Sequence, residues 1–337
     1  MNVSVMQENL ARGLGIVGRA VSSRATLPVL ANVLLKTENA GLKLTATNLE
    51  IGINCWVPGK VVDEGEITVP AKLLADLVSS LPNQRIDLQF SAKDRTLKVT
   101  SGGSRSSIKG IEADEFPVVA AIGDTPATSA DSRALRDALA EVVFAAASDE
   151  SRPILTGVLT RLAGETMTLA AADNYRIAVR TLALAKAVTP EMTIVVPARS
   201  YAELMRILPD AEESIEITVT PNKSQVLFHV AGIDLVSRLI EGQFPNYEPV
   251  IPTAHTSRAV LDRFGYGYGH TTILERPRWV YSFVLNENFT AATNPFAQLR
   301  TINQRRIPLA QGNDRCRFGN GKIFAVMLDY PRAPRQF

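Results

Sequence analysis

The sequence predicts an α+β protein made of repeated modules, each with an antiparallel sheet and two helices on one side of it. Two observations support this prediction. A series of short motifs occurs twice in the same order, about 125 residues apart, and each copy contains two helical periodicities together with runs of alternating apolar residues. Because this repeat is much longer than a solenoid unit, each copy is expected to form a domain with its own core.

The repeat rests on five blocks whose offset grows only from 125 to 129 residues. They are residues 28–34, 47–51, 69–72, 81–82 and 111–117 in the first copy, and 153–159, 173–177, 196–199, 208–209 and 240–245 in the second. We therefore expect one domain over residues 1–122 and a second over residues 123–252.

Each copy opens with an amphipathic helix, over residues 7–22 and 132–148. Their apolar residues recur at helical spacing, namely Leu10, Leu14, Val17 and Val21 in the first and Leu135, Leu139, Val142 and Ala146 in the second. A second helix is expected from Ala71 to about Leu81 and from Ala198 to about Leu208. Each of these follows a proline, a residue favoured at helix starts.

Apolar residues alternate with polar ones in the remaining segments, as in strands with one buried face. The clearest cases are residues 42–44, 51–55 and 86–90 in the first copy and residues 167–169 and 215–219 in the second. Cys55 falls within such a run and is expected in a strand core. His229 also alternates with apolar neighbours, which favours a sheet residue over a ligand.

A third copy begins at the spacing expected from the first two, but its sequence soon ceases to resemble them. Residues 132–135 recur as residues 257–260, and the likeness between copies stops after Arg263. From residue 264 to 337 the chain has 12 of its 21 aromatic residues and a net charge of +6, whereas residues 1–263 carry −4. We therefore expect residues 253–337 to hold the start of a third domain, up to about residue 263, and then a divergent segment that is read out of frame or replaced, and is disordered or poorly packed.

The composition is that of an ordinary soluble protein, with 46% apolar residues and a net charge of +2. No apolar run approaches the length that spans a membrane, and Glu8 and Arg12 interrupt the first apolar stretch, unlike a signal peptide. Cys55 and Cys316 are far apart in sequence and match neither a disulfide framework nor a metal-ligand spacing. A cytoplasmic protein without a metal or cofactor is expected.

Basic residues return on the outward faces of the same two helices in both copies. They are Arg12, Arg19, Lys72, Arg133, Arg199 and Arg206. Any one of them fits a solvated helix position. Residues 1–263 are net acidic, so the recurrence of these cations indicates that positive charge is confined to one surface. Such a surface suits binding to a phosphate backbone without recognition of individual bases.

The internal repeat and five segments together resemble the bacterial sliding clamp, the beta subunit of the replicative DNA polymerase. The segments are residues 3–10, 24–35, 69–77, 149–159 and 244–252, and the resemblance covers roughly residues 1–263. It implies a DNA-clamp fold with three similar domains per subunit, closed head to tail into a homodimeric ring around duplex DNA. Such a ring is not an enzyme. It would be a processivity factor that tethers the catalytic subunit of DNA polymerase III, the clamp loader and other replication or repair proteins.

The resemblance places the DNA contacts on basic and polar residues near the helix-side turns. Here these are Arg24, Lys72, Asp149, Arg152 and Arg199. Such contacts would be weak and salt-sensitive, as sliding requires. For Arg24, a role as a helix-end cation beside backbone carbonyls is an equal alternative.

The resemblance also implies a cleft in the second domain that accepts short apolar peptides from partner proteins. Its residues would be Asp173, Tyr175, Arg176, Ile177, Pro245 and Val250. An apolar floor with an arginine at its rim suits an extended peptide. The alternative is that Ile177, Pro245 and Val250 belong to the domain core.

Two other functions stay open at the level of the sequence. Without a third domain, the chain would be a clamp-derived product that cannot close a ring and is inactive or only binds partner peptides. Gly13, Gly15 and Gly18 also form a literal G-x-G-x-x-G, which would indicate a nucleotide-binding enzyme if it opened a helix after a strand. Here the glycines lie inside a helical pattern, so close packing of that helix is the better explanation.

Overall fold

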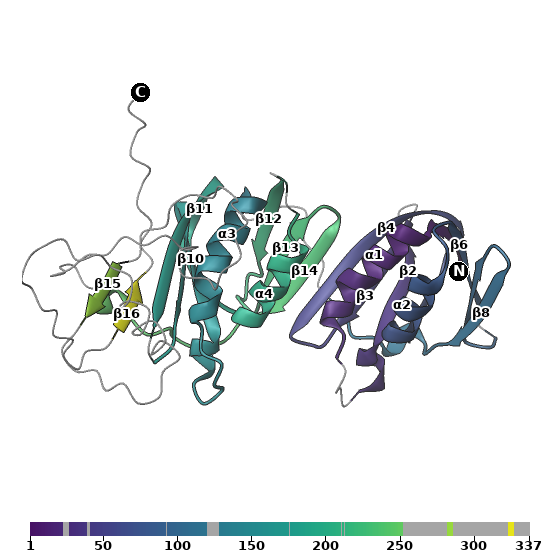
Figure 1. Ribbon diagram of the computed structural model, residues 1–337, viewed down its shortest axis with the longest axis horizontal. Helices are drawn as coiled ribbons and strands as arrows, with labels where there is room; N and C mark the ends of the chain where they lie inside the picture. The colour runs from purple at the N-terminus through teal and green to yellow at the C-terminus, as the bar shows by residue number, and fades with distance from the viewer. Residues whose placement is uncertain are drawn as a thin grey trace, which may run out of the picture.

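The computed structural model describes residues 1–22, 27–38, 41–91, 93–119, 128–174, 176–209, 211, 213–251, 282–285 and 323–326. The elements β1 to η3 form module one, and the elements β9 to η6 form module two (Figure 1). Both modules are α+β with antiparallel strands, so the predicted fold class is confirmed.

Among the described residues, module one contains eight β-strands, β1 to β8, and two α-helices, α1 and α2. Its elements are β1 (Asn2–Met6), α1 (Gln7–Val17), η1 (Gly18–Ala20), η2 (Pro28–Ala31), β2 (Asn32–Glu38), β3 (Gly41–Thr47), β4 (Ile51–Asp63), β5 (Glu66–Pro70), α2 (Ala71–Ser80), β6 (Arg85–Ser91), β7 (Thr96–Ser101), β8 (Ser104–Lys109) and η3 (Ala113–Glu115).

Module two repeats this order. Its elements are β9 (Thr128–Asp131), α3 (Ser132–Val142), η4 (Val143–Ala145), η5 (Pro153–Thr156), β10 (Gly157–Ala172), β11 (Ile177–Pro197), α4 (Ala198–Ile207), β12 (Ser214–Val219), β13 (Gln225–Val230), β14 (Ile233–Arg238) and η6 (Glu248–Val250). The long strand β10 corresponds to β2 and β3 together, and β11 corresponds to β4 and β5. The pairing of β10 with β11 shifts register around Gly164, where module one has the turn between β2 and β3.

The two modules are joined by strand pairing. In the main sheet the strands follow the order β8-β7-β6-β1-β4-β14-β13-β12-β9, so β4 of module one lies beside β14 of module two. Ile233 lies opposite Cys55 and Ser237 opposite Ile51 in this antiparallel pair. Buried apolar residues of both modules form one connected cluster. The repeat predicts two cores, and the structure connects them through this junction.

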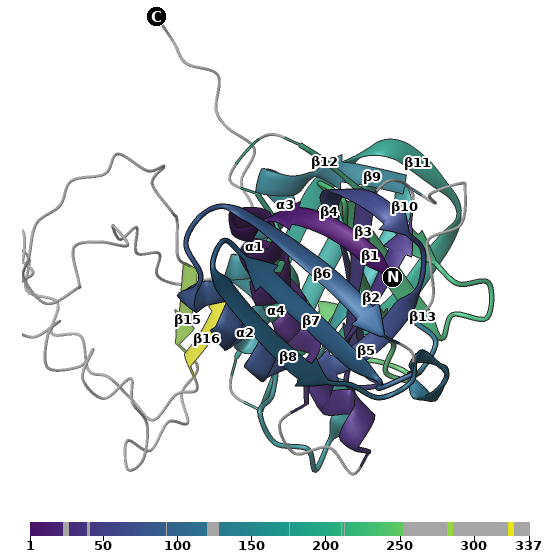
Figure 2. The same ribbon diagram turned by 90° about the vertical axis from the view of Figure 1, so that its right-hand side faces the viewer.

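The helices of both modules lie on one side of the sheets (Figures 1 and 2). Helix α1 packs beside α2, and α3 packs beside α4. The predicted faces are the buried ones: Leu10, Leu14 and Val17 in α1, and Leu135, Leu139 and Val142 in α3. Both opening helices end earlier than predicted, at Val17 and Val142, and continue as short 3₁₀ turns. Gly18 is the C-cap residue of the first and has right-handed helical backbone angles, so the chain passes directly into the 3₁₀ turn.

Helix α4 is fixed to the sheet by a buried aromatic side chain. Tyr201 is 1% exposed, and its hydroxyl lies 2.7 Å from that of Thr160 on β10. The Phe228 ring on β13 is 5.8 Å away, between centroids. The Tyr201 hydroxyl therefore has a hydrogen-bond partner inside an otherwise apolar core, as a buried phenol requires.

Two residues singled out in the sequence have structural roles. Cys55 is buried in β4, which confirms the predicted strand core. The Nδ1 atom of His229 lies 2.6 Å from the carboxylate of Asp234 on the neighbouring strand, so this histidine is a satisfied sheet residue.

The glycine triplet does not form a phosphate-binding turn, because Gly13 and Gly15 lie within helix α1 and Gly18 caps it. Gly13 faces the sheet, where an added Cβ would lie 2.9 Å from both Leu44 Cδ1 and Val57 Cγ2. Nothing lies within 4 Å of a Cβ added at Gly15 or Gly18. Close packing therefore explains Gly13, and the dinucleotide hypothesis loses its structural basis.

The expectations for residues 264–337 lie outside the described residues except for two short strands. These strands, β15 (Ser282–Leu285) and β16 (Ile323–Val326), pair antiparallel. In the part of the chain that the structure describes, no helix has both the length and the apolar character needed to cross a lipid bilayer.

The contrast between two glycines of α1 gives a stability prediction. Gly13→Val forces a branched side chain against Leu44 and Val57 and is expected to lower the free energy of unfolding by about 1–3 kcal/mol, as overpacked cores do. Gly15→Val, in the same helix but facing open space, is expected to leave it unchanged or raise it by a few tenths of a kcal/mol. Urea unfolding monitored by circular dichroism compares the two variants, and equal effects would contradict the packing role of Gly13.

The thiol of Cys55 is expected to be unreactive in the folded protein. Burial raises its pKa to about 11, so almost no thiolate forms at mildly alkaline pH. In a Cys316→Ser variant, a thiol-specific reagent should label the protein only in denaturant. Because the folded-state pKa lies above the unfolded one, the unfolding free energy should also fall as the pH rises from 9 to about 11. Rapid labelling of the native protein below pH 9 would be inconsistent with this burial.

Candidate functional site

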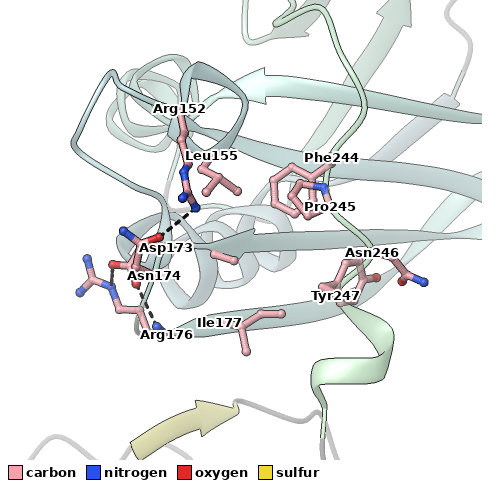
Figure 3. Close-up of a pocket in the computed structure, with 11 residues that line it drawn as sticks. Arg152, Leu155, Asp173, Asn174, Arg176, Ile177, Phe244, Pro245, Asn246 and Tyr247 are labelled. Atoms are coloured by element: carbon pink, nitrogen blue, oxygen red, sulfur yellow. Dashed lines mark hydrogen bonds and ion pairs between the residues drawn. The ribbon is translucent and has the colours of Figure 1, made fainter. Parts of the chain in front are cut away.

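A cleft of about 210 Å³ opens on module two where three segments meet. One is η5 with the residue before it, the second is the turn between β10 and β11, and the third is the chain that leaves β14 (Figure 3). The cleft is lined by Arg152, Leu155, Ala172, Asp173, Asn174, Arg176, Ile177, Phe244, Pro245, Asn246 and Tyr247.

The turn from β10 to β11 is held by the side chain of Asp173. Its carboxylate accepts hydrogen bonds from the backbone N–H of Arg176 at 2.9 Å and from Arg176 Nε at 2.8 Å. The backbone N–H of Asp173 donates to the carbonyl of Arg176 at 3.0 Å. Asp173 therefore orders the turn, as Asp commonly does, and fixes the direction of the arginine.

The floor of the cleft is apolar. Leu155 is 8% exposed, Ile177 4% and Phe244 8%. Leu155 and Phe244 pack together with Val195 in a small cluster separate from the main core. Exposed Pro245 and half-buried Tyr247 continue this surface toward solvent. An apolar pocket of this size accommodates one or two side chains of a ligand, which is smaller than a typical small-molecule site.

The rim of the cleft is polar and basic. Arg152 donates from Nη1 to the side-chain oxygen of Asn174 at 3.3 Å (Figure 3). The guanidinium of Arg176 lies over the Phe144 ring, 5.7 Å from its centroid, a favourable cation–π geometry. On the other side, burial and the neighbouring carboxylate of Glu248 raise the pKa of Tyr247, so its hydroxyl stays protonated and able to donate.

Most of the predicted cleft residues meet at this place. Asp173, Arg176, Ile177 and Pro245 all line it. Tyr175 and the side chain of Val250 lie outside the described residues; Val250 itself belongs to η6. The sequence reasoning missed Leu155, Phe244 and Tyr247. Leu155 and Phe244 both fall in repeated blocks, but a repeated apolar residue is equally well explained as part of a domain core.

In module one the place that corresponds to the cleft is filled by the side chain of Val119. By strand register Gly52, which lies opposite Thr47, corresponds to Ile177, which lies opposite Ala172, and Val119 corresponds to Tyr247 in the repeat. Val119 approaches Gly52 so closely that an added Cβ would lie 2.6 Å from Val119 Cγ1. Val119 thereby packs against the Val29, Leu30 and Phe116 cluster. In module two the side chain of Ile177 occupies the position that Gly52 leaves open in module one, and it forms part of the cleft floor.

The predicted helix-side cations are exposed. Lys72 and Arg199 are the second residues of α2 and α4, at equivalent positions of the two modules, and both side chains face solvent. Their helices lie on the same side of the sheets (Figure 1). The two modules therefore present positive charge at matching places on one face.

Two further predicted DNA contacts, Asp149 and Arg152, lie at the turn before η5. Asp149 accepts hydrogen bonds from the backbone N–H of Ser151 at 2.9 Å and from its hydroxyl at 2.6 Å, and these bonds lower the pKa of Asp149. The carboxylate thus orders the turn that carries the exposed Arg152, which also borders the cleft. Arg24 lies outside the described residues.

Among the described residues, no group of three or more His, Cys, Asp and Glu side chains is arranged to hold a metal ion.

Comparison with known proteins identifies both modules. The family model for the N-terminal domain of the DNA polymerase III beta subunit matches residues 1–120, and the model for the central domain of that subunit matches residues 130–246.

Curated relatives and solved structures agree with these matches. The beta sliding clamp of Synechocystis sp. is 34% identical over 281 residues, which cover 78% of this chain and 72% of the relative. That of Synechococcus elongatus is 35% identical over 267 residues, covering 78% and 71%.

Among solved structures, the Bacillus subtilis DNA polymerase sliding clamp superposes with a TM-score of 0.72 at 27% identity, covering 76% of this chain and 68% of that one. The DNA polymerase III subunit beta of Pseudomonas aeruginosa gives a TM-score of 0.70 at 31% identity, covering 76% and 69%. By fold, by both domain models and by these relatives, the chain belongs to the beta sliding clamp family, the non-catalytic beta subunit of DNA polymerase III.

Proposed function

We propose that this chain acts as part of a ring that encircles duplex DNA and tethers the catalytic subunit of DNA polymerase III to it. The observation that carries this proposal is the β4–β14 junction, which continues the sheet from one module to the next with the helices on one side. A chain of modules joined this way turns one helical wall toward its centre. The exposed Lys72 and Arg199 on that wall suit a polyanion.

The internal repeat supports head-to-tail closure. Strand β8 corresponds to β14 in the repeat and lies at the edge of the main sheet. The start of β11, at residues 177–180, corresponds to residues 52–55 of β4, which pair with β14. Module one thus has a free edge, β8, that is equivalent to β14, and module two has an edge at the start of β11 that is equivalent to the paired part of β4. A head-to-tail assembly needs two such complementary edges. We infer a homodimer with three domains per subunit, over residues 1–122, 123–252 and from 253 onward.

The DNA contacts in this proposal come from Arg24, Lys72, Arg152 and Arg199, with Asp149 ordering the turn that presents Arg152. They are few and lie on exposed side chains, so each adds little affinity and the ring can move along the duplex. The ring holds its partners by raising their effective concentration at the DNA. The clamp loader and other replication or repair proteins are the further partners, and the cytoplasm is the expected compartment.

The cleft on module two is the proposed docking point for these partners. Its apolar floor of Leu155, Ile177 and Phe244 and its Arg152 and Arg176 rim suit a short extended peptide with apolar side chains and an acidic group. Tyr175 and Val250 are the further residues assigned to it.

Topological binding is tested with circular DNA. The protein loaded on a nicked plasmid by a clamp loader should co-elute with the DNA in gel filtration and be lost after the plasmid is linearised. Light scattering should give the mass of a closed dimer. A monomer that is not retained on the circle would instead identify a clamp-derived product that cannot close a ring.

The cleft is tested with Ile177→Ala. Removing part of the floor should weaken binding of a fluorescein-labelled peptide rich in Leu and Phe by about tenfold, corresponding to roughly 1.4 kcal/mol. Fluorescence anisotropy measures this change. Ile215→Ala, a fully buried residue of β12 in the same module, is the control for general destabilisation and should leave peptide affinity unchanged. Equal losses in both variants would argue against the cleft as the docking point.

A further inference from the structure

Glu203 on α4 contacts arginines of both modules on the helical face. Its Oε2 lies 3.5 Å from Nη1 of Arg19 in module one, and its Oε1 lies 2.7 Å from Nη1 of Arg206 in module two. Each carboxylate oxygen thus takes one guanidinium. The side chain of Glu203 is 14% exposed, against 35% for Arg19 and 59% for Arg206.

Arg19 and Arg206 differ from Lys72 and Arg199 in their position on the helical face and in their contact with a carboxylate. Arg19 belongs to η1, directly after α1, and Arg206 to the last turn of α4. The carboxylate therefore lies at the junction and connects the helical layers of the two modules, as β4 and β14 connect the sheets. Lys72 and Arg199, by contrast, are exposed near the starts of their helices.

We propose that Glu203 sets the strength of DNA binding by keeping Arg19 and Arg206 from the phosphate backbone. This inference rests on the proposed function, in which the helical face meets DNA. A phosphate that approaches either arginine must compete with a carboxylate already in contact with it and is repelled by that same charge. Without Glu203 the junction would present two free cations, and each further phosphate contact adds to the affinity and to its salt dependence.

The physical benefit of this arrangement is mobility. A ring needs positive charge to admit DNA, but strong contacts at fixed positions would slow its movement along the duplex. Because Arg19 and Arg206 remain partly exposed, their ion pairs with Glu203 contribute little stability, so Glu203 can moderate the field of the two arginines at little cost to the fold.

The variant Glu203→Gln tests this proposal, because it keeps the shape of the side chain and removes its charge. Binding to a short fluorescein-labelled linear duplex is measured by anisotropy over a range of NaCl concentrations. The variant should bind several-fold more tightly at low salt, and the slope of log K against log[NaCl] should become steeper by about one to two. An unchanged affinity and slope would overturn the proposal.

Two controls separate release of the arginines from a general charge effect. Asp137→Asn removes one exposed carboxylate from α3 and should change affinity much less than Glu203→Gln. Adding Arg19→Gln and Arg206→Gln to Glu203→Gln should abolish the gain. If Asp137→Asn matches Glu203→Gln, or if the triple variant keeps the gain, the specific role of Glu203 is rejected.

A second comparison covers the case in which Glu203→Gln does not fold. In the parent protein, Arg19→Gln with Arg206→Gln should weaken binding less than Lys72→Gln with Arg199→Gln, because the first pair is already engaged. The opposite order would overturn the proposal.

Failure of this proposal is distinguishable from failure of the proposed function. Retention of the parent protein on the nicked circle, together with an unchanged Glu203→Gln affinity, would reject the role of Glu203 alone. Loss of retention, together with tighter binding of Glu203→Gln to linear duplex, would reject the ring and leave the role of Glu203 standing.

Discussion

The antiparallel pairing of β4 with β14 is the interaction on which the rest of the structure depends. It joins strands of both modules into one sheet that runs from β8 to β9, and it places their helices on a common side. Two backbone hydrogen bonds lie at its ends, from Trp56 to the carbonyl of Gly232 at 3.1 Å and from Arg238 to that of Glu50 at 2.9 Å. Because strand pairing fixes register and direction at once, this junction sets the relative orientation of the two helical layers more firmly than side-chain packing alone would.

The same duplicated elements have diverged where the modules serve different purposes. In module one the segment after Phe116 folds onto Gly52 and closes the surface. In module two Ile177 stands at the position of Gly52 and lines the cleft together with the corresponding segment, Phe244 to Tyr247. Glycine at this position of module one and isoleucine in module two thus accompany a closed cluster on one copy and a cleft on the other, since close packing leaves no room for both a side chain and a crossing chain segment.

Charge on the helical face is distributed in two ways. Lys72 and Arg199 are exposed at equivalent places in the two modules. Arg19 and Arg206 are engaged by one carboxylate at the junction. A count of basic residues along the helices treats all four alike, whereas their availability to a polyanion differs because opposite charges in contact attenuate each other's field.

The sequence by itself determined the repeat, the faces of α1 and α3, the helix starts after Pro70 and Pro197, and the family, because periodicity and local motifs are properties of neighbouring residues. It also placed Asp173, Arg176, Ile177 and Pro245 near one another through resemblance. Only the tertiary structure decided that β14 joins β4, that Leu155, Phe244 and Tyr247 complete the cleft, and that Glu203 meets Arg19 across 184 residues of chain. These contacts join segments far apart in sequence, and the pattern of a single segment does not encode which distant edge or side chain will meet it.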